Sequence, residues 1–201
     1  MSSDVIRTFV AVAVSDEVRA AVAAAEERLR RTGADVKWVD PGSVHVTLKF
    51  LGNVEAGRMG DLAGRLGEAL AGTAGFDVTV AGAGTFPQGR KSVRVVWFGL
   101  TEGRESLAAV AGLVDRACFR LGFPKEERPF SPHLTIGRVR RESRRLAELA
   151  LEVQALQFNP LKVRVDRVNL MRSELSPKGP AYTVLESFAL IESGKGGGVW
   201  I

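Results

Sequence analysis

Two short segments of the chain alternate polar and apolar residues in the same way. The first reads His45-Val46-Thr47-Leu48 and the second reads His133-Leu134-Thr135-Ile136, and they hold the only two histidines of the sequence. This period-two pattern predicts a β-strand at each place, with the apolar side chains directed into a core. Because every second side chain of a strand points to the same side, each segment should present an imidazole and a hydroxyl on one face.

The elements around these two segments repeat with the same spacing of 88 residues. Apolar runs of strand type at 7–12 and 95–100 each precede a histidine, by 36 residues when counted from Phe9 and from Trp97. A stripe of apolar residues at helical spacing follows each run. The first stripe comprises Val14, Val18, Val22, Ala25 and Leu29, and the second Val110, Leu113, Val114, Ala117 and Leu121. We interpret the shared spacing as an internal duplication.

The duplication predicts an α+β fold of two pseudo-symmetric lobes, each a mainly antiparallel sheet backed by helices. Strands at 76–85 and 93–100 should pair as one hairpin, and strands at 162–171 and 181–190 as another. No linker rich in Pro or Ser separates the halves, so we expect residues 1–192 to form a single bilobal domain. The glycine-rich residues 193–201 are predicted to be a flexible tail. If the approximate twofold symmetry brings the two histidine segments face to face, they line one groove.

Composition narrows the class of protein. Of the 201 residues, 45% are hydrophobic, which suffices for a sizeable core, yet no apolar run reaches the ~18 residues of a membrane span. Cys118 is the only cysteine and falls on the buried side of a predicted helix, which suits a reducing cytosol, so we expect a cytoplasmic protein. The net charge of +5 weakly favours a polyanionic partner.

The placement of the cations is more informative than their total. Arg90 and Lys178 lie in the loops of the two predicted hairpins and are again 88 residues apart. Arg138 comes two residues after the second histidine segment. Further arginines come soon after it, at positions 140, 141, 144 and 145. Each could be an ordinary solvated charge, but a shared position on the histidine side of both lobes favours anion binding.

Two imidazoles and two hydroxyls around one groove suit displacement at phosphorus. One histidine can act as base while the other acts as acid, since both protonation states are accessible near pH 7. The threonine hydroxyls can donate hydrogen bonds to phosphate oxygens, and this chemistry requires no metal and no cofactor. Two histidines could instead ligate zinc, but a zinc site needs a third or fourth ligand, and no carboxylate lies at ligand spacing. A serine-type triad fits poorly with two equivalent histidines, and core histidines satisfied by their neighbouring threonines are the remaining alternative.

At these residues the chain resembles the two-histidine phosphoesterase superfamily. Within it, the chain is most similar to the LigT/ThpR group of RNA 2′,3′-cyclic phosphodiesterases, historically called 2′-5′ RNA ligases. The resemblance extends over nearly the whole sequence. It rests on Arg7-Thr8-Phe9-Val10-Ala11, on residues 45–52, on residues 132–138 and on residues 173–180.

The resemblance implies a bilobal α+β fold with the active site in the central cleft. It also implies metal-independent hydrolysis of an RNA-terminal 2′,3′-cyclic phosphate to a 2′-phosphomonoester. It implies that His45 protonates the departing 3′ oxygen and that His133 activates water, although a symmetric site does not reveal which histidine has which role. Thr47 and Thr135 would hold the phosphate oxygens. Arg138 matches an arginine of the family that contacts phosphate.

Arg138 poses a geometric problem, because it lies five residues after His133 and so on the opposite face of a regular strand. A bulge permitted by Gly137 could re-aim it. Phe50 is its counterpart in the first half and would either pack against a base or fill the core. For Phe9 we favour the core, and for Tyr182 a structural role.

The expected substrates are RNA ends or small cyclic nucleotides, with no membrane and no obligatory protein partner. Reversible 2′-5′ RNA ligation is an alternative, in which the same chemistry runs backwards and a ribose hydroxyl replaces water. A second alternative is a non-catalytic module that binds nucleotides or RNA. The intact histidine–threonine pairs disfavour the second.

Overall fold

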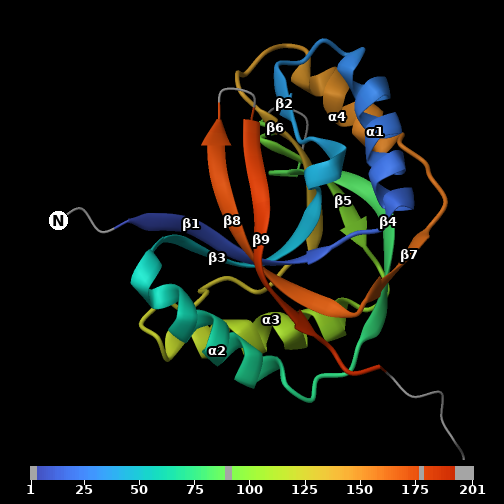
Figure 1. Ribbon diagram of the computed structural model, residues 1–201. Coiled ribbons are helices and arrows are strands. Elements are labelled where there is room, and N and C mark those ends of the chain that lie inside the picture. Colours follow the sequence, from blue (N-terminus) through green and yellow to red (C-terminus); the bar gives the residue numbers. More distant parts are fainter. Residues whose placement is uncertain (1–3, 89–91, 177–178, 193–201) are drawn as a thin grey trace, which may run out of the picture.

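The computed structural model describes residues 4–88, 92–176 and 179–192 of the chain (Figure 1). Its strands are β1 (Val5–Ala13), β2 (Val36–Trp38), β3 (His45–Glu55), β4 (Phe76–Phe86), β5 (Val95–Leu100), β6 (His133–Val139), β7 (Leu161–Val165), β8 (Arg167–Ser176) and β9 (Gly179–Ala189). Its helices are α1 (Asp16–Arg30), α2 (Met59–Leu70), α3 (Arg104–Phe119) and α4 (Leu146–Gln154), with 3₁₀ turns at Pro41–Ser43 and Ala56–Arg58.

The nine strands form one sheet in the order β7-β4-β5-β6-β3-β1-β8-β9, with β2 alongside β6. The two strands that begin with a histidine, β3 and β6, are therefore the middle of the sheet. They pair only where Val46 lies opposite Leu134, because β2 takes the same edge of β6 from Gly137 onward. We call β3-β1-β8-β9 the first lobe and β6-β5-β4-β7 the second lobe. The predicted α+β fold of two antiparallel lobes is confirmed.

The duplication is visible in the elements, but the two halves have exchanged parts. A shift of 88 residues carries β1 onto β5, β3 onto β6, α1 onto α3 and α2 onto α4. Yet β4, from the first half of the chain, lies in the second lobe, and β8, from the second half, lies in the first. Two of the helices are exchanged as well, since α3 packs on β3 of the first lobe and α1 contacts α4, which packs on β4 of the second. Figure 1 shows the resulting pairs, α1 with α4 and α2 with α3, on opposite sides of the molecule.

One predicted strand is wrong in its extent. The segment 162–171 is divided at Asp166, so that β7 pairs with β4 in the second lobe and β8 pairs with β1 and β9 in the first. Val163 and Val165 are buried before the break, and Val168 and Leu170 after it, so the apolar alternation shifts by one position there. That shift marks a change of partner, because a one-residue slip moves every side chain to the other face. The hairpin of β4 with β5 has the expected pairing.

The helices form where the apolar stripes predict them. Val18, Val22 and Leu29 of α1 are fully buried, as are Val114 and Cys118 of α3. Within the described residues, no helix combines the length and the apolar composition needed to cross a membrane.

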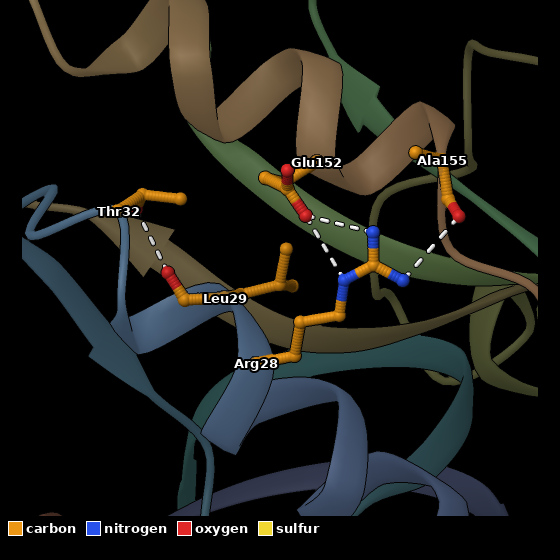
Figure 2. Close-up of polar contacts among 5 residues, drawn as sticks. All are labelled: Arg28, Leu29, Thr32, Glu152 and Ala155. Atoms are coloured by element: carbon orange, nitrogen blue, oxygen red, sulfur yellow. Dashed lines mark hydrogen bonds and ion pairs between the residues drawn. The ribbon is translucent and has the colours of Figure 1, made fainter.

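An ion pair ties α1 to α4 across the second lobe (Figure 2). The guanidinium of Arg28 donates through Nε and Nη2 to one carboxylate oxygen of Glu152, at 2.9 and 2.8 Å, and reaches the carbonyl of Ala155 at 3.5 Å. Beside it, the Thr32 hydroxyl donates to the carbonyl of Leu29 at 2.8 Å and closes the end of α1. Because Arg28 and Glu152 are exposed, the pair adds at most about 1 kcal/mol, and apolar burial holds the helices in place.

A buried carboxylate in α1 makes stability depend on pH. Glu26 is 4% exposed, its Oε2 lies 3.2 Å from Nη2 of Arg30, and its Oε1 has no hydrogen-bond partner. Burial raises the pKa of Glu26 to about 7. A pKa raised in the folded state means that stability is lost as the pH rises from the unfolded value through 7.

We expect Glu26→Gln to raise the free energy of unfolding at pH 8 by roughly 1–3 kcal/mol, because the neutral amide avoids burying an ionised carboxylate. The gain should shrink toward zero at pH 5, where Glu26 of the folded protein is already protonated. Urea denaturation at the two pH values measures both effects. A variant less stable than the parent at pH 8 would contradict this account.

Candidate active site

The four side chains of the two sequence segments lie on one face of the sheet. Val46 and Leu134, directly opposite each other, are both buried in the helix-covered core. Their chain neighbours must therefore point to the other side, because successive side chains of a strand alternate. These neighbours are His45, Thr47, His133 and Thr135, all half-buried. We call this side of the sheet the histidine face.

The antiparallel register of Val46 with Leu134 can be continued by one residue in each direction. Each histidine then lies opposite the threonine of the other strand. His45 then comes opposite Thr135, and Thr47 comes opposite His133. Each imidazole thus has a hydroxyl on its own strand and another on the neighbouring strand. The arrangement can offer two hydroxyl donors and two ring nitrogens to a single bound group.

The two histidine rings are held in the same way. Nδ1 of His45 lies 2.8 Å from the carbonyl oxygen of Ser43, and Nδ1 of His133 lies 2.8 Å from that of Ser131. A carbonyl only accepts, so Nδ1 carries the proton in both rings. When the ring is neutral, Nε2 is then the atom with the free lone pair, and it can take up a proton or, once protonated, donate one.

The surroundings of the two rings differ. His45 stacks on Phe9, with ring centroids 4.8 Å apart, and the ring of Tyr182 lies nearly perpendicular to it at a centroid distance of 5.1 Å. This burial lowers the pKa of His45, and the carbonyl of Ser43 only partly opposes the shift. His133 instead meets the ring of Phe86, at 5.2 Å and nearly perpendicular.

A matching bulge in each lobe re-aims the residue five places after each histidine. In β3, Lys49 pairs with Val10 and Thr47 with Ala11, so Leu48 is the extra residue. In β6, Gly137 pairs with Val96 and Thr135 with Trp97, so Ile136 is the extra residue. An extra residue reverses the alternation. The residues beyond the two bulges, Phe50 and Arg138, therefore return to the histidine face.

Two observations agree with this direction. The ring of Phe50 lies 6.2 Å from that of Phe9, which itself stacks on His45, and Phe50 is 61% exposed. Burial raises the pKa of Tyr182, and the positive charges of Arg138 and then Arg7 oppose the rise. Arg138 thus acts on the ring that borders His45.

Gly137 has a packing role beside the bulge. A Cβ at this position would come 2.8 Å from Cγ1 of Val36 and 2.9 Å from Cε3 of Trp38. The glycine lets β2 lie close against β6, while the bulge itself falls one residue earlier, at Ile136.

Sequence reasoning missed the role of Lys49. Its ammonium lies 2.7 Å from Oδ1 of Asp115 and donates to the carbonyl of Pro124 at 2.8 Å, and the residue is 3% exposed. Burial alone would raise the pKa of Asp115, but hydrogen bonds led by that from Lys49 lower it overall. The pair anchors β3 to α3 on the face opposite the histidines. The sequence gives little indication of this buried pair, since a lysine within an apolar strand is usually predicted to lie on the surface.

Two of the other predicted cations, Arg141 and Arg145, contact the segment that follows α1. Arg90 and Lys178 lie outside the described residues. Arg145 donates to the carbonyl of Thr32 at 3.2 Å, and Arg141 lies 4.0 Å from Asp35, so both face the end of α1. The described residues contain no cluster of three or more His, Cys, Asp or Glu side chains that could hold a metal ion.

Phe9 and Cys118 are both buried. Phe9 is 3% exposed, but its ring contacts His45 and Tyr182 rather than the helix-covered core favoured from the sequence. Tyr182 has a comparable position, because its ring contacts both Phe9 and His45 at a centroid distance of 5.1 Å. Cys118 lies on the buried side of α3 as predicted, and burial raises the pKa of its thiol to about 11.

We expect neutral His45 and His133 to be protonated at Nδ1, because each Nδ1 faces a backbone carbonyl. Two-bond ¹H–¹⁵N correlation spectra at pH 8 report the tautomer of each ring. His133→Ala assigns the spectrum by removing one set of signals. Predominant protonation at Nε2 would show that these carbonyl bonds do not hold the rings in solution.

Comparison with known proteins identifies the family of the chain. The family model described as the 2′-5′ RNA ligase superfamily matches residues 10–177. The chain therefore belongs to this superfamily, as the resemblance of its histidine segments indicated.

Curated relatives and solved structures span most of the chain. The RNA 2′,3′-cyclic phosphodiesterase of Methanothermobacter thermautotrophicus is 38% identical over 187 residues, which cover 92% of this chain and 99% of the relative. That of Thermotoga maritima is 34% identical over 90% of this chain and 93% of its own length. A crystal structure of a Thermus thermophilus protein matches with a TM-score of 0.77 and 29% identity, over 94% of this chain and 100% of its own. Escherichia coli LigT complexed with 3′-AMP matches with a TM-score of 0.71 and 25% identity over the same shares.

Proposed function

We propose that this chain is an RNA 2′,3′-cyclic phosphodiesterase, which hydrolyses a terminal cyclic phosphate to a 2′-phosphomonoester by metal-independent acid–base catalysis. One observation carries the proposal: two histidines with the same tautomer lie on one face of adjoining strands, each beside a threonine. Curated relatives of that activity, which are similar over nine tenths of the chain, support it.

The reaction uses the two Nε2 atoms at opposite ends of a line through phosphorus. One Nε2 takes a proton from water as the water oxygen bonds to phosphorus. The other Nε2–H protonates the 3′ oxygen as its bond to phosphorus breaks, which leaves the phosphate on the 2′ oxygen. Thr47 and Thr135 donate to the phosphate oxygens, and Arg138 supplies positive charge to them. Each positioned acid or base contributes about 10²–10⁴-fold in rate.

The surroundings of His45 favour the role of base. Enclosure by Phe9 and Tyr182 withdraws water from the ring, which disfavours the imidazolium and lowers the pKa of His45. A neutral ring is ready to accept a proton. We therefore assign the base to His45 and the acid to His133, which reverses the roles that the resemblance implied.

We expect His45→Ala and His133→Ala each to lower kcat by about 10²–10⁴-fold, since each removes one proton-transfer group. The substrate is an oligoribonucleotide ending in a 2′,3′-cyclic phosphate, with the product identified as the 2′- or 3′-monophosphate. Thermal denaturation shows whether both variants remain folded. Near-parental turnover by either folded variant would exclude the two-histidine mechanism. A parent that binds the oligonucleotide without cleaving it would point to the non-catalytic module.

Ligation of a 2′-5′ bond is the second candidate, and the description of the superfamily favours it. It uses the same groups in reverse, with a ribose hydroxyl in place of water. Adding an oligoribonucleotide with free terminal hydroxyls to the assay reveals it as a longer product.

The acid–base assignment predicts the effect of Tyr182→Ala on the pH profile of kcat/KM. Removing the ring rehydrates His45 and raises its pKa toward the ordinary value. If His45 is the base, the acid limb of the profile moves to higher pH, because the base must be deprotonated to act. Tyr182→Phe keeps the ring and is the matched control, with a profile close to the parent's. Movement of the alkaline limb instead would make His45 the acid.

A further inference from the structure

A groove at the start of β1 and the end of β3 that is distant from His45 takes no part in the mechanism above. It has a volume of about 350 Å³ and lies among the first residues of β1, the end of β3 and the middle of β8. Its walls include Val5, Arg7, Asn53, Arg172, Ser173 and Glu174.

The groove continues from the histidine face. Arg7 lies two residues before Phe9 on β1, so the two side chains point to the same side, and Asn53 lies directly opposite Arg7. The charge of Arg7 acts on Tyr182, the ring whose edge meets His45. On β3 the exposed Phe50 lies between Thr47 and Asn53, and so between the site and the groove.

Arg7 supplies the available positive charge of the groove. Arg172 is already neutralised by Glu174, at 2.6 Å. Arg7 is exposed, and no carboxylate among the described residues forms an ion pair with it. A guanidinium held in this way on a strand is suited to a phosphate, which accepts two parallel hydrogen bonds from it.

The distance along the strand distinguishes this groove from the reaction centre. Ala11 pairs with Thr47, and Arg7 lies four residues further along β1, about 13 Å at the rise of a strand. A phosphate held by Thr47 is thus far from the backbone of Arg7. The spacing suits a second phosphate of the same nucleic-acid chain.

We propose that the groove is a subsite for the RNA on the 5′ side of the terminal nucleoside, which carries the cyclic phosphate. Arg7 pairs with the phosphodiester that joins this nucleoside to the preceding nucleotide. Asn53 and Ser173 offer polar atoms to the same nucleotide, and Phe50 offers a ring face on which a base can stack. The inference rests on the proposed function and narrows its substrate class. The preferred substrate is the end of an RNA chain rather than a cyclic mononucleotide.

The test compares Arg7→Gln with the parent on two substrates. One is a short oligoribonucleotide ending in a 2′,3′-cyclic phosphate, and the other is cytidine 2′,3′-cyclic monophosphate, which has no 5′ phosphate. We expect the ratio of kcat/KM for the oligonucleotide to that for the mononucleotide to fall about tenfold, through KM rather than kcat. Arg7→Lys, which keeps the charge, should recover most of the ratio. Rising salt should lower the ratio for the parent more than for Arg7→Gln.

Arg104→Gln is the matched control. Arg104 begins α3, which packs on the opposite face of the sheet, so removing its charge should leave the ratio unchanged. A parent that does not prefer the oligonucleotide, or an Arg7→Gln variant with an unchanged ratio, overturns the proposal. Equal loss on both substrates also overturns it, because Arg7 would then contact the reacting phosphate.

A binding experiment separates this inference from the proposed function. Fluorescence anisotropy with an oligoribonucleotide ending in a 2′-monophosphate compares Arg7→Gln with the parent without turnover. About tenfold weaker binding by the variant supports the subsite, even if the parent cleaves no cyclic phosphate and the proposed function fails. Equal binding overturns the subsite, whatever the activity.

Discussion

The contact between Val46 and Leu134 is the constraint on which the site depends. It is the single paired position between β3 and β6, and both side chains are fully withdrawn into the core. As long as apolar burial holds them there, the alternation of each strand directs a histidine and a threonine to the opposite face. The chemistry of the protein thus rests on a position with no chemical function of its own.

The exchange of elements between the halves of the sequence supports the junction of β3 with β6. The helix that follows β5 covers the first lobe, and β4 and β8 each lie in the lobe opposite their own half. Neither lobe contains all of its strands and helices from one half of the sequence. Elements from both halves of the sequence therefore contact each strand that carries a histidine, since α3 packs on β3 and β2 pairs with β6.

Within this symmetric backbone, the side chains around the two histidines differ. Both lobes have the same carbonyl bond to Nδ1 and the same bulge, three residues after each histidine. Beyond the bulge, one lobe presents Phe50 and the other Arg138. Enclosure by aromatic rings is greater at His45 than at His133. Different environments are one way in which two chemically identical groups take opposite roles in proton transfer.

The sequence by itself determined the strands that carry the histidines, the shared face of each histidine–threonine pair, the apolar stripes of α1 and α3, and the duplication. These are local properties, because the apolar periodicity of a strand or helix is determined by residues close together in the sequence. Tertiary structure alone decided the change of partner at Asp166, the inward turn of Lys49, the bulges that re-aim Phe50 and Arg138, and the approach of Tyr182 to His45. The physical reason is that periodicity only assigns a residue to one side of its own strand. Pairing partners and bulges depend on neighbouring strands that are distant in the sequence. The same holds for the contact between His45 and Tyr182, which are 137 residues apart.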